Sequence, residues 1–233
     1  MHSTRLPITT YKCISVFFSL NSIFFFYPNK NFSYQHIIIK YIVSFKQTEM
    51  SLLEICFHGR GGQGAVTAAN LIAFAALKSG NKGVQAFPFF GAERRGAPVK
   101  AFARIDSKEV FLRSEITHPD IVVVLDTGIM NIIDVTKGLE QKGIILLNTP
   151  RQPHDFSFPC TVATVDATSI ALKNNILVGG IPVVNTPMVG ALVSLLDNVN
   201  LDSLEQAIHD RFKGKQAENN IQAVRQAYKE VIT

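Results

Sequence analysis

A glycine-rich stretch has the composition of a loop that binds anions. It lies between an apolar run and a segment with helical spacing, and it reads Gly59-Arg60-Gly61-Gly62-Gln63-Gly64. Glycines let the backbone approach a phosphate because they have no Cβ, and the free N–H groups at the start of a helix attract negative charge. Arg60 adds a full positive charge to the same place. The loop is therefore predicted to bind an anionic group such as a phosphate.

Two other interpretations of this loop stay open. Its spacing also fits the dinucleotide fingerprint, which would make the protein a free-standing oxidoreductase that uses NAD. That fingerprint normally includes an acidic residue about 20 residues further on, at the end of the second strand. The sequence has no Asp or Glu between Glu54 and Glu93, so half of the NAD signature is missing. In the third interpretation the glycines only permit a tight turn and close packing of helix on strand.

A second segment, residues 87–99, places charged residues between glycines and beside three phenylalanines. Its charged centre is Glu93-Arg94-Arg95. Guanidinium groups bind carboxylate and phosphate through two parallel hydrogen bonds, so an anionic ligand is one prediction for this segment. The alternative is that Glu93 pairs with one of the arginines and braces the loop.

The two segments together closely resemble the gamma subunit of pyruvate and related 2-oxoacid:ferredoxin oxidoreductases. Residues 59–65 and 89–99 carry most of the resemblance. It extends to the C-terminus through further matching positions, which are Pro119-Asp120, Asn148 and residues 185–191. Residues 1–49 have no counterpart in this family.

The resemblance implies an activity that this chain shares with other subunits. The complete enzyme of this family decarboxylates a 2-oxoacid on thiamine diphosphate with Mg, passes two electrons through iron–sulfur clusters to ferredoxin, and transfers the acyl group to coenzyme A. With pyruvate the products are acetyl-CoA and CO2. This chain would hold no catalytic residue, metal or cofactor of its own and would be inactive alone. Its expected partners are alpha, beta and ferredoxin-like delta subunits in the cytoplasm, with no nucleic acid and no membrane.

The resemblance also implies a site at which this chain meets coenzyme A or a neighbouring subunit, close to the thiamine. The residues expected there are Gly59, Arg60, Gly61, Gly62, Gln63, Gly64, Glu93, Arg94 and Arg95. A second possibility implied by the family is an assembly module without a ligand, in an enzyme for branched-chain 2-oxoacids.

Cysteine usage and charge exclude several classes of protein. The three cysteines, Cys13, Cys56 and Cys160, are far apart and cannot supply the four thiolates of an iron–sulfur cluster. The formal net charge is +5, but residues 1–49 carry five Lys or Arg against one acidic residue, which leaves 18 basic and 17 acidic residues in the rest. The basic pI is therefore no sign of a nucleic-acid partner.

Residues 1–49 differ in composition from the rest of the chain. They hold seven of the 17 Phe and four of the five Tyr but no Ala, Gly or Asp. Their apolar runs are too short for a spanning helix, and small residues for a signal-peptide cleavage site are scarce. We expect a non-native or disordered extension from a start codon assigned too far upstream, with Met50 as the first residue of the natural protein. A signal peptide is the alternative.

Residues 50–233 are predicted to form a single α/β domain that positions both segments. Short apolar runs alternate with helical spacing, as in an open, mostly parallel (mixed), Rossmann-like sheet flanked by helices, with a helical C-terminus. The predicted strands are 54–58, 84–87, 99–105, 109–113, 121–125, 144–147 and 161–166, with 99–105 and 109–113 as a hairpin. The predicted helices are 65–78, 130–141, 167–174, 186–196, 202–212 and 217–231.

Three side chains have a predicted place at helix starts or strand ends. Thr186 and Asp202 are expected to be N-caps of the helices that they begin. Asp126 follows the strongest β-branched run, and ligands of open α/β sheets gather at the carboxyl ends of strands. Capping a helix is the alternative role for Asp126.

Overall fold

The computed structural model describes residues 17–19, 22–24, 52–89 and 96–233. The chain divides into two compact units, Met1–Thr48 and Glu49–Thr233. In the first unit, strands β1 (Phe17–Ser19) and β2 (Ser22–Phe24) form an antiparallel pair. Within the described residues no helix is long and apolar enough to cross a membrane. The origin proposed above for residues 1–49 stays a prediction.

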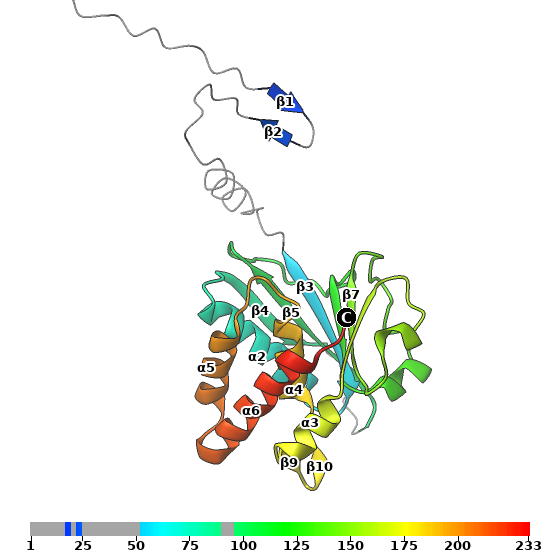
Figure 1. The fold of residues 1–233 in the computed structure, drawn as a ribbon, viewed down its shortest axis with the longest axis vertical. Coiled ribbons are helices and arrows are strands. Elements are labelled where there is room, and N and C mark those ends of the chain that lie inside the picture. Colours follow the sequence, from blue (N-terminus) through cyan, green and yellow to red (C-terminus); the bar gives the residue numbers. More distant parts are fainter. Residues whose placement is uncertain (1–16, 20–21, 25–51, 90–95) are drawn as a thin grey trace, which may run out of the picture. The chain divides into compact units, whose positions relative to one another are not determined.

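The second unit is built on a six-stranded mixed sheet (Figure 1). Its order is β4-β5-β3-β6-β7-β8. Strands β3, β6, β7 and β8 run parallel, and β5 runs antiparallel to both of its neighbours. The α/β class with a mostly parallel, mixed sheet is confirmed. The strands are β3 (Leu53–Arg60), β4 (Gly83–Pro88), β5 (Pro98–Asp106), β6 (Ile121–Val124), β7 (Ile144–Asn148) and β8 (Thr161–Val165).

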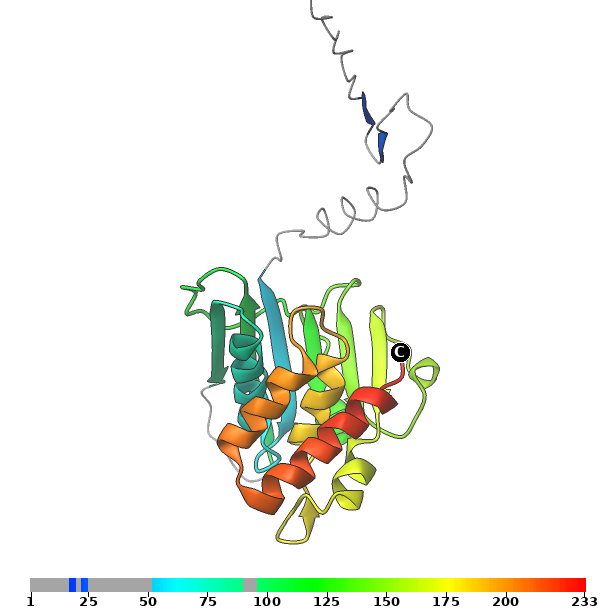
Figure 2. The ribbon, with the colours of Figure 1, turned by 60° about the vertical axis from the view of Figure 1, so that its left-hand side comes forward.

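Five α-helices pack on one face of this sheet (Figure 2). They are α2 (Ala65–Lys78), α3 (Ala167–Lys173), α4 (Asn185–Val193), α5 (Leu201–Arg211) and α6 (Gly214–Glu230). The other face is covered by irregular chain between residues 116 and 160, which includes the 3-10 helices η1 (Thr127–Asn131) and η2 (Pro153–Asp155). A short hairpin of β9 (Leu177–Val178) and β10 (Ile181–Pro182) follows α3.

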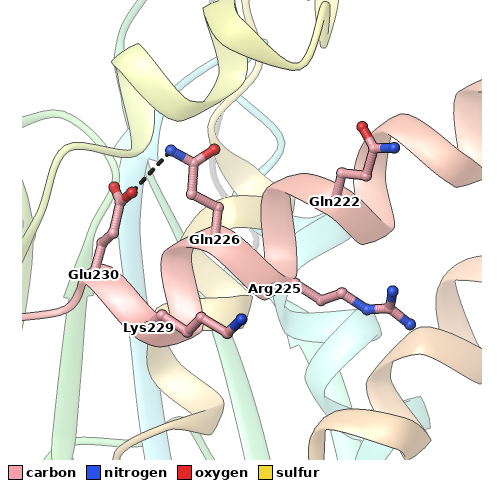
Figure 3. A pocket seen from close by; sticks show the side chains of 5 residues that line it. All are labelled: Gln222, Arg225, Gln226, Lys229 and Glu230. Atoms are coloured by element: carbon pink, nitrogen blue, oxygen red, sulfur yellow. Dashed lines mark hydrogen bonds between the residues drawn. The ribbon is translucent and has the colours of Figure 1, made fainter.

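Helix α6 turns a polar side to solvent, where five side chains line a shallow hollow of about 380 Å³ (Figure 3). Three of these side chains are already engaged with one another or with a neighbouring element. Gln226 Nε2 donates to Glu230 Oε1 at 3.0 Å, and Arg225 pairs with Glu205 of α5. The hollow is therefore a solvated helix face. Its lining residues are Gln222, Arg225, Gln226, Lys229 and Glu230.

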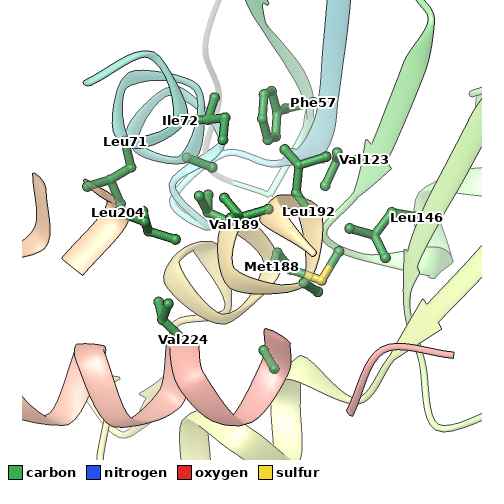
Figure 4. Close-up of a cluster of buried hydrophobic side chains, with 14 of the residues drawn as sticks. Phe57, Leu71, Ile72, Val123, Leu146, Met188, Val189, Leu192, Leu204 and Val224 are labelled. Carbon is green, nitrogen blue, oxygen red and sulfur yellow. The ribbon is translucent and has the colours of Figure 1, made fainter. Parts of the chain in front are cut away.

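Helix α4 is buried over its whole length and forms the middle of the core (Figure 4). It lies between the sheet and α6, with Met188 and Leu192 beside sheet residues and Val224 of α6 on its other side. Such all-round burial explains why its sequence is apolar on every side and has no amphipathic pattern.

Two predicted elements are wrong. Residues 130–141 form no α-helix, because Asp134 accepts hydrogen bonds from the N–H and hydroxyl of Thr136 and so offers the backbone a turn instead. Residues 109–113 form no strand. Strand β5 has β3 on one edge and β4 on the other, so no edge is left for a hairpin partner, and Phe111 is 82% exposed.

Both predicted N-caps are also wrong. Helix α5 begins at Leu201, and Asn200 is its cap, since its Oδ1 accepts from Ser203 N at 2.8 Å. Helix α4 begins at Asn185, one residue before the predicted cap Thr186. Helix α2 agrees with the prediction at both ends, and Gly80 follows it with a φ of 96°.

Candidate functional site

Strand β3 runs directly into the glycine loop, and the loop runs into α2. Two of its glycines have left-handed backbones, Gly62 with φ 97° and Gly64 with φ 81°. Gly64 is the N-cap of α2 and also touches α4, because a Cβ built on it would lie 2.5 Å from Asn185 Nδ2. Glycine at position 64 is therefore required both by the backbone angle and by the contact with α4.

The charge of Arg60 is paired inside the loop's own neighbourhood. Its Nε donates to Asp126 Oδ2 at 2.9 Å, and its Nη1 donates to the carbonyl oxygen of Gly96 at 3.3 Å. About a third of each of the two ionic side chains is exposed. In this arrangement the Arg60 side chain stabilises the loop. The positively polarised groups near the loop that remain without a partner are the first backbone N–H groups of α2.

Gln63, near the C-terminal end of the glycine loop, stabilises the loop through two hydrogen bonds. Its Oε1 accepts from Arg60 N at 2.7 Å, and its Nε2 donates to Asp126 Oδ2 at 3.0 Å. Gln63 is thus the side chain that closes the turn between the first and last glycines.

Asp126 receives three donors and joins the loop to the end of β6. Besides Arg60 and Gln63, the N–H of Gly128 donates to its Oδ1 at 2.8 Å, which makes Asp126 the N-cap of η1. Burial by itself would raise the pKa of this carboxyl, but the hydrogen bonds from Gln63, Arg60 and Gly128 outweigh burial and hold the pKa below its usual range. Of the two roles considered for Asp126, capping is the one that the geometry supports.

The backbone donors at the start of α2 are unpaired. Gly64 provides no side-chain cap. In the part of the chain that the structure describes, the N–H groups of Ala65, Val66 and Thr67 have no acceptor. Unpaired N–H groups at the start of a 14-residue helix attract an anion.

Asn185 adds a side-chain donor at the same place, a feature that sequence analysis did not find. It is 6% exposed, its Oδ1 accepts from Thr186 N at 2.8 Å, and its Nδ2 lies against Gly64. Within the described ranges Nδ2 has no acceptor. The sequence marks residues 185–187 only as a helix start, and nothing in it indicates that this start meets a loop about 120 residues earlier.

The charged segment reaches the glycine loop at its C-terminal end. Residues 90–95, and with them Glu93, Arg94 and Arg95, lie outside the described residues. Directly after them, Gly96 N donates to the carbonyl oxygen of Gly61 at 3.3 Å, and Gly61 N donates to that of Ala97 at 2.9 Å. The chain that leaves the charged segment is therefore hydrogen-bonded to the middle of the glycine loop.

The strand order does not support the dinucleotide interpretation. In that fold the second strand lies parallel beside the first, so that an acidic residue at its end reaches the ribose. Here the strand after α2, β4, is separated from β3 by the antiparallel β5. Strand β4 ends in Pro88 and contains no Asp or Glu that could bind a ribose.

Two further groups near the loop are buried and uncharged. His58 is 3% exposed, with Nε2 3.3 Å from Cys56 Sγ, and its Nδ1 has no partner among the described residues. Burial, with a smaller effect of Lys100, lowers the pKa of His58 to about 4, and burial raises the pKa of the Cys56 thiol to about 12. No cluster of three or more potential metal ligands occurs within the described residues.

Comparison with known proteins covers nearly all of the second unit. Residues 54–230 match the family described as "Pyruvate ferredoxin/flavodoxin oxidoreductase". The chain is 48% identical over 182 residues to the "Pyruvate/ketoisovalerate oxidoreductases common subunit gamma" of Pyrococcus furiosus, which covers 76% of this chain and 96% of that protein. It is 48% identical over 181 residues to the "Pyruvate synthase subunit PorC" of Methanocaldococcus jannaschii, covering 78% and 98%.

Solved structures share the fold. The pyruvate oxidoreductase subunit PORC of Thermotoga maritima superposes with a TM-score of 0.67 at 37% identity, covering 78% of this chain and 98% of that one. A 2-oxoglutarate:ferredoxin oxidoreductase from Magnetococcus marinus superposes with a TM-score of 0.61 at 18% identity, covering 78% of this chain and 31% of that one. The second likeness is one of fold alone.

Proposed function

This chain belongs to the pyruvate ferredoxin/flavodoxin oxidoreductase family as a gamma subunit of a 2-oxoacid:ferredoxin oxidoreductase, and we propose that the enzyme it completes oxidises pyruvate. The reaction would convert pyruvate, coenzyme A and oxidised ferredoxin into acetyl-CoA, CO2 and reduced ferredoxin. The names of the relatives support pyruvate, since each of those described above from Pyrococcus, Methanocaldococcus and Thermotoga includes it.

In this proposal the redox and decarboxylation chemistry belongs to the other subunits in the cytoplasm. Thiamine diphosphate with Mg would be held by the alpha and beta subunits, and iron–sulfur clusters would lie on partners that include a ferredoxin-like delta subunit. The described part of this chain offers no cluster of metal ligands, and its two described cysteines are separate. We expect the gamma subunit alone to oxidise no 2-oxoacid.

The role that we propose for this chain is to bind the phosphates of coenzyme A at the start of α2. The observation that carries this proposal is the meeting of open α2 N–H groups with the unpaired, buried amide of Asn185. Gly59, Gly61, Gly62 and Gly64 shape the backbone there, while Arg60 and Gln63 hold the loop through Asp126.

Arg94, Arg95 and Glu93 complete the proposed site. The residue that follows them, Gly96, is hydrogen-bonded to Gly61 of the glycine loop, and guanidinium groups bind phosphate. A contact of the same residues with a neighbouring subunit is the second candidate, in which the chain acts as an assembly module.

The substitution Asn185→Asp tests the coenzyme A proposal in the assembled enzyme. It keeps the acceptor for Thr186 N but replaces the amide donor with a negative oxygen. Losing a hydrogen bond to a charged group weakens binding by roughly 1.5–3 kcal/mol, so KM for coenzyme A should rise roughly 10- to 150-fold. KM for pyruvate should not change. Steady-state kinetics with each substrate varied in turn measures both.

Asn219→Asp on α6 is the matched control, because it makes the same chemical change away from the glycine loop. An unchanged KM for coenzyme A in Asn185→Asp would reject the proposed site. Arg94→Ala and Arg95→Ala separate the two candidates. A raised coenzyme A requirement supports ligand binding, whereas an unchanged requirement with weaker assembly supports the module.

A further inference from the structure

The β9–β10 hairpin exposes several aliphatic side chains. Val178 is 69% exposed, Ile181 62% and Leu177 43%, and Leu172 at the end of α3, which packs against the hairpin, is 50% exposed. Val178 and Ile181 are directly opposite each other in the antiparallel pair, so their side chains lie on one face. These two residues form an exposed apolar pair on that face of the hairpin, and Leu177 lies on the other face. Grouped exposed apolar side chains mark an interaction site more often than single ones do.

The turn of the hairpin is built from two glycines. Gly179 and Gly180 form its two-residue turn with φ values of 60° and 80°, the positive angles that a tight hairpin turn of this type needs. A Cβ on either glycine would meet nothing within 4 Å, so the tip projects into open space.

The base of the hairpin is tied to the core. Ile176 is buried and donates its N–H to the carbonyl oxygen of Ala171 at 2.9 Å, and Val183 N donates to that of Ile176 at 2.9 Å. Asn174 fixes the same point, since its Nδ2 reaches Ile170 O at 2.8 Å and Gln226 Oε1 at 3.0 Å. A hairpin held at its base loses less conformational entropy on docking than a free loop, which favours recognition by a preformed partner.

The charge pattern indicates an apolar partner surface. Residues 174–183, which form the hairpin and its base, contain no Asp, Glu, Lys, Arg or His, although the hairpin is at the surface. Depletion of charge with exposed aliphatic side chains is typical of the core of a protein–protein interface.

The hairpin lies at the end of the domain that carries the candidate site. Figures 1 and 2 both show it at the same end of the sheet as the start of α2. Only Val183 and Val184 separate β10 from Asn185, which lies against Gly64. A protein surface that covers the hairpin would therefore continue directly to the glycine loop.

From these observations we infer that the β9–β10 hairpin docks into an apolar groove of another subunit of the same oxidoreductase, next to the glycine loop. The inference rests on the proposed function in taking the partner to be a subunit of that enzyme. A partner that reaches both the hairpin and the loop completes a ligand site from two chains, whereas a second copy of this chain has no such reason to border the loop.

The test replaces the two most exposed residues of the hairpin by lysine, in the variant Val178→Lys/Ile181→Lys. The full chain is co-expressed with its partner subunits, and the affinity of gamma for the remaining subunits is measured. Removing the centre of an interface weakens binding by at least about 30-fold, which is the expected effect. A milder variant, Val178→Thr/Ile181→Thr, keeps the β-branched shape and should weaken binding in the same direction.

The matched control is Phe74→Lys/Leu77→Lys on α2, where the two side chains are 53% and 52% exposed. Its affinity should stay that of the wild type, and all variants should keep the thermal unfolding midpoint of the full chain. Normal assembly of both hairpin variants overturns the inference. A dimer of the isolated chain that the hairpin variants abolish, with the complex unaffected, also overturns it in favour of self-association.

This test is independent of the coenzyme A proposal. Hairpin variants should reduce the amount of complex and leave KM for coenzyme A unchanged in the complex that forms. Asn185→Asp should have the reverse effect.

Discussion

At the scale of single residues, Asp126 holds the candidate site together. Its place after an apolar run identifies it as a residue at a strand end. Capping and ligand binding both place a carboxylate there, so the sequence alone does not distinguish the two roles. Its three donors come from positions 60, 63 and 128, and the first two lie more than 60 residues away along the chain.

We predict that Asp126→Asn destabilises the domain. The amide keeps one acceptor but loses the charge that Arg60 and Gln63 share, so the free energy of unfolding should fall by about 1–3 kcal/mol at pH 7. The folded pKa of Asp126 lies below its ordinary 3.8. The stabilisation is therefore present above pH 3.8 and is lost as the pH falls through the folded pKa.

Urea unfolding of the wild type and Asp126→Asn as a function of pH measures this effect. The difference between the two proteins should be largest near neutrality and should shrink below pH 3.8. A difference that is equally large at both ends of this range would contradict the role of the ionised carboxylate.

A second prediction at this scale separates two requirements for glycine. Gly64→Ala and Gly80→Ala both place an alanine at a positive φ, which costs roughly 1–2 kcal/mol. At Gly80 a Cβ meets nothing within 4 Å, whereas at Gly64 it lies 2.5 Å from Asn185 Nδ2.

Gly64→Ala should therefore lose more stability than Gly80→Ala, by about another 1–3 kcal/mol. Chemical denaturation of both variants gives the difference. Equal losses would mean that Asn185 moves aside freely, which would also weaken its place in the candidate site.

At the scale of elements, the position of α4 decides the geometry of the site, because its first residue is Asn185. Helix α4 approaches α6 very closely at Gly190, where a Cβ would lie 2.6 Å from Val224 O and 2.8 Å from Val224 Cα. Both neighbours are backbone atoms, so neither can rotate out of the way.

We predict that Gly190→Ala pushes α4 and α6 apart and lowers the free energy of unfolding by about 1–3 kcal/mol. Because α4 carries Asn185, KM for coenzyme A in the assembled enzyme should also rise. Unfolding curves and kinetics of the same variant test the two consequences. If Gly190→Ala were as stable as the wild type, the contact between α4 and α6 would have to accommodate a methyl group, which would contradict the prediction.

The spacing of apolar residues predicted helices and strands well where one side of the element is regularly buried, and poorly elsewhere. Helix α2 was predicted with its actual bounds because six alanines favour a helix and Gly80 ends it. A helix was predicted for residues 130–141, but the side chain of Asp134 accepts a hydrogen bond from Thr136 and the backbone forms a turn there. The β9–β10 hairpin was missed because a pair of two-residue strands is too short for an alternating pattern to appear.

At the scale of the whole molecule, we propose that residues 50–233 fold independently of residues 1–49. The division of the chain into Met1–Thr48 and Glu49–Thr233 and the family match over residues 54–230 support this. A protein that starts at Met50 should have the same thermal unfolding midpoint as the full chain and should assemble equally well.

Calorimetry and co-purification with the partner subunits check this prediction. Mass spectrometry of the natural protein checks whether it starts at Met50. Natural peptides from residues 1–49 would refute the proposed start at Met50. Loss of stability or assembly in the shortened protein would show that these residues belong to the functional subunit.

The sequence by itself determined the family and the fold class, and it singled out the glycine loop as a candidate site. Glycine spacing, apolar runs and the charged segment are local features, and local features are present in the chain before it folds. Only the tertiary structure decided that Asp126 forms an ion pair with Arg60, that the amide Nδ2 of Asn185 lies against Gly64, and that β5 separates β4 from β3. Each of these joins residues far apart along the chain, and such contacts depend on how strands and helices pack, which no local pattern contains.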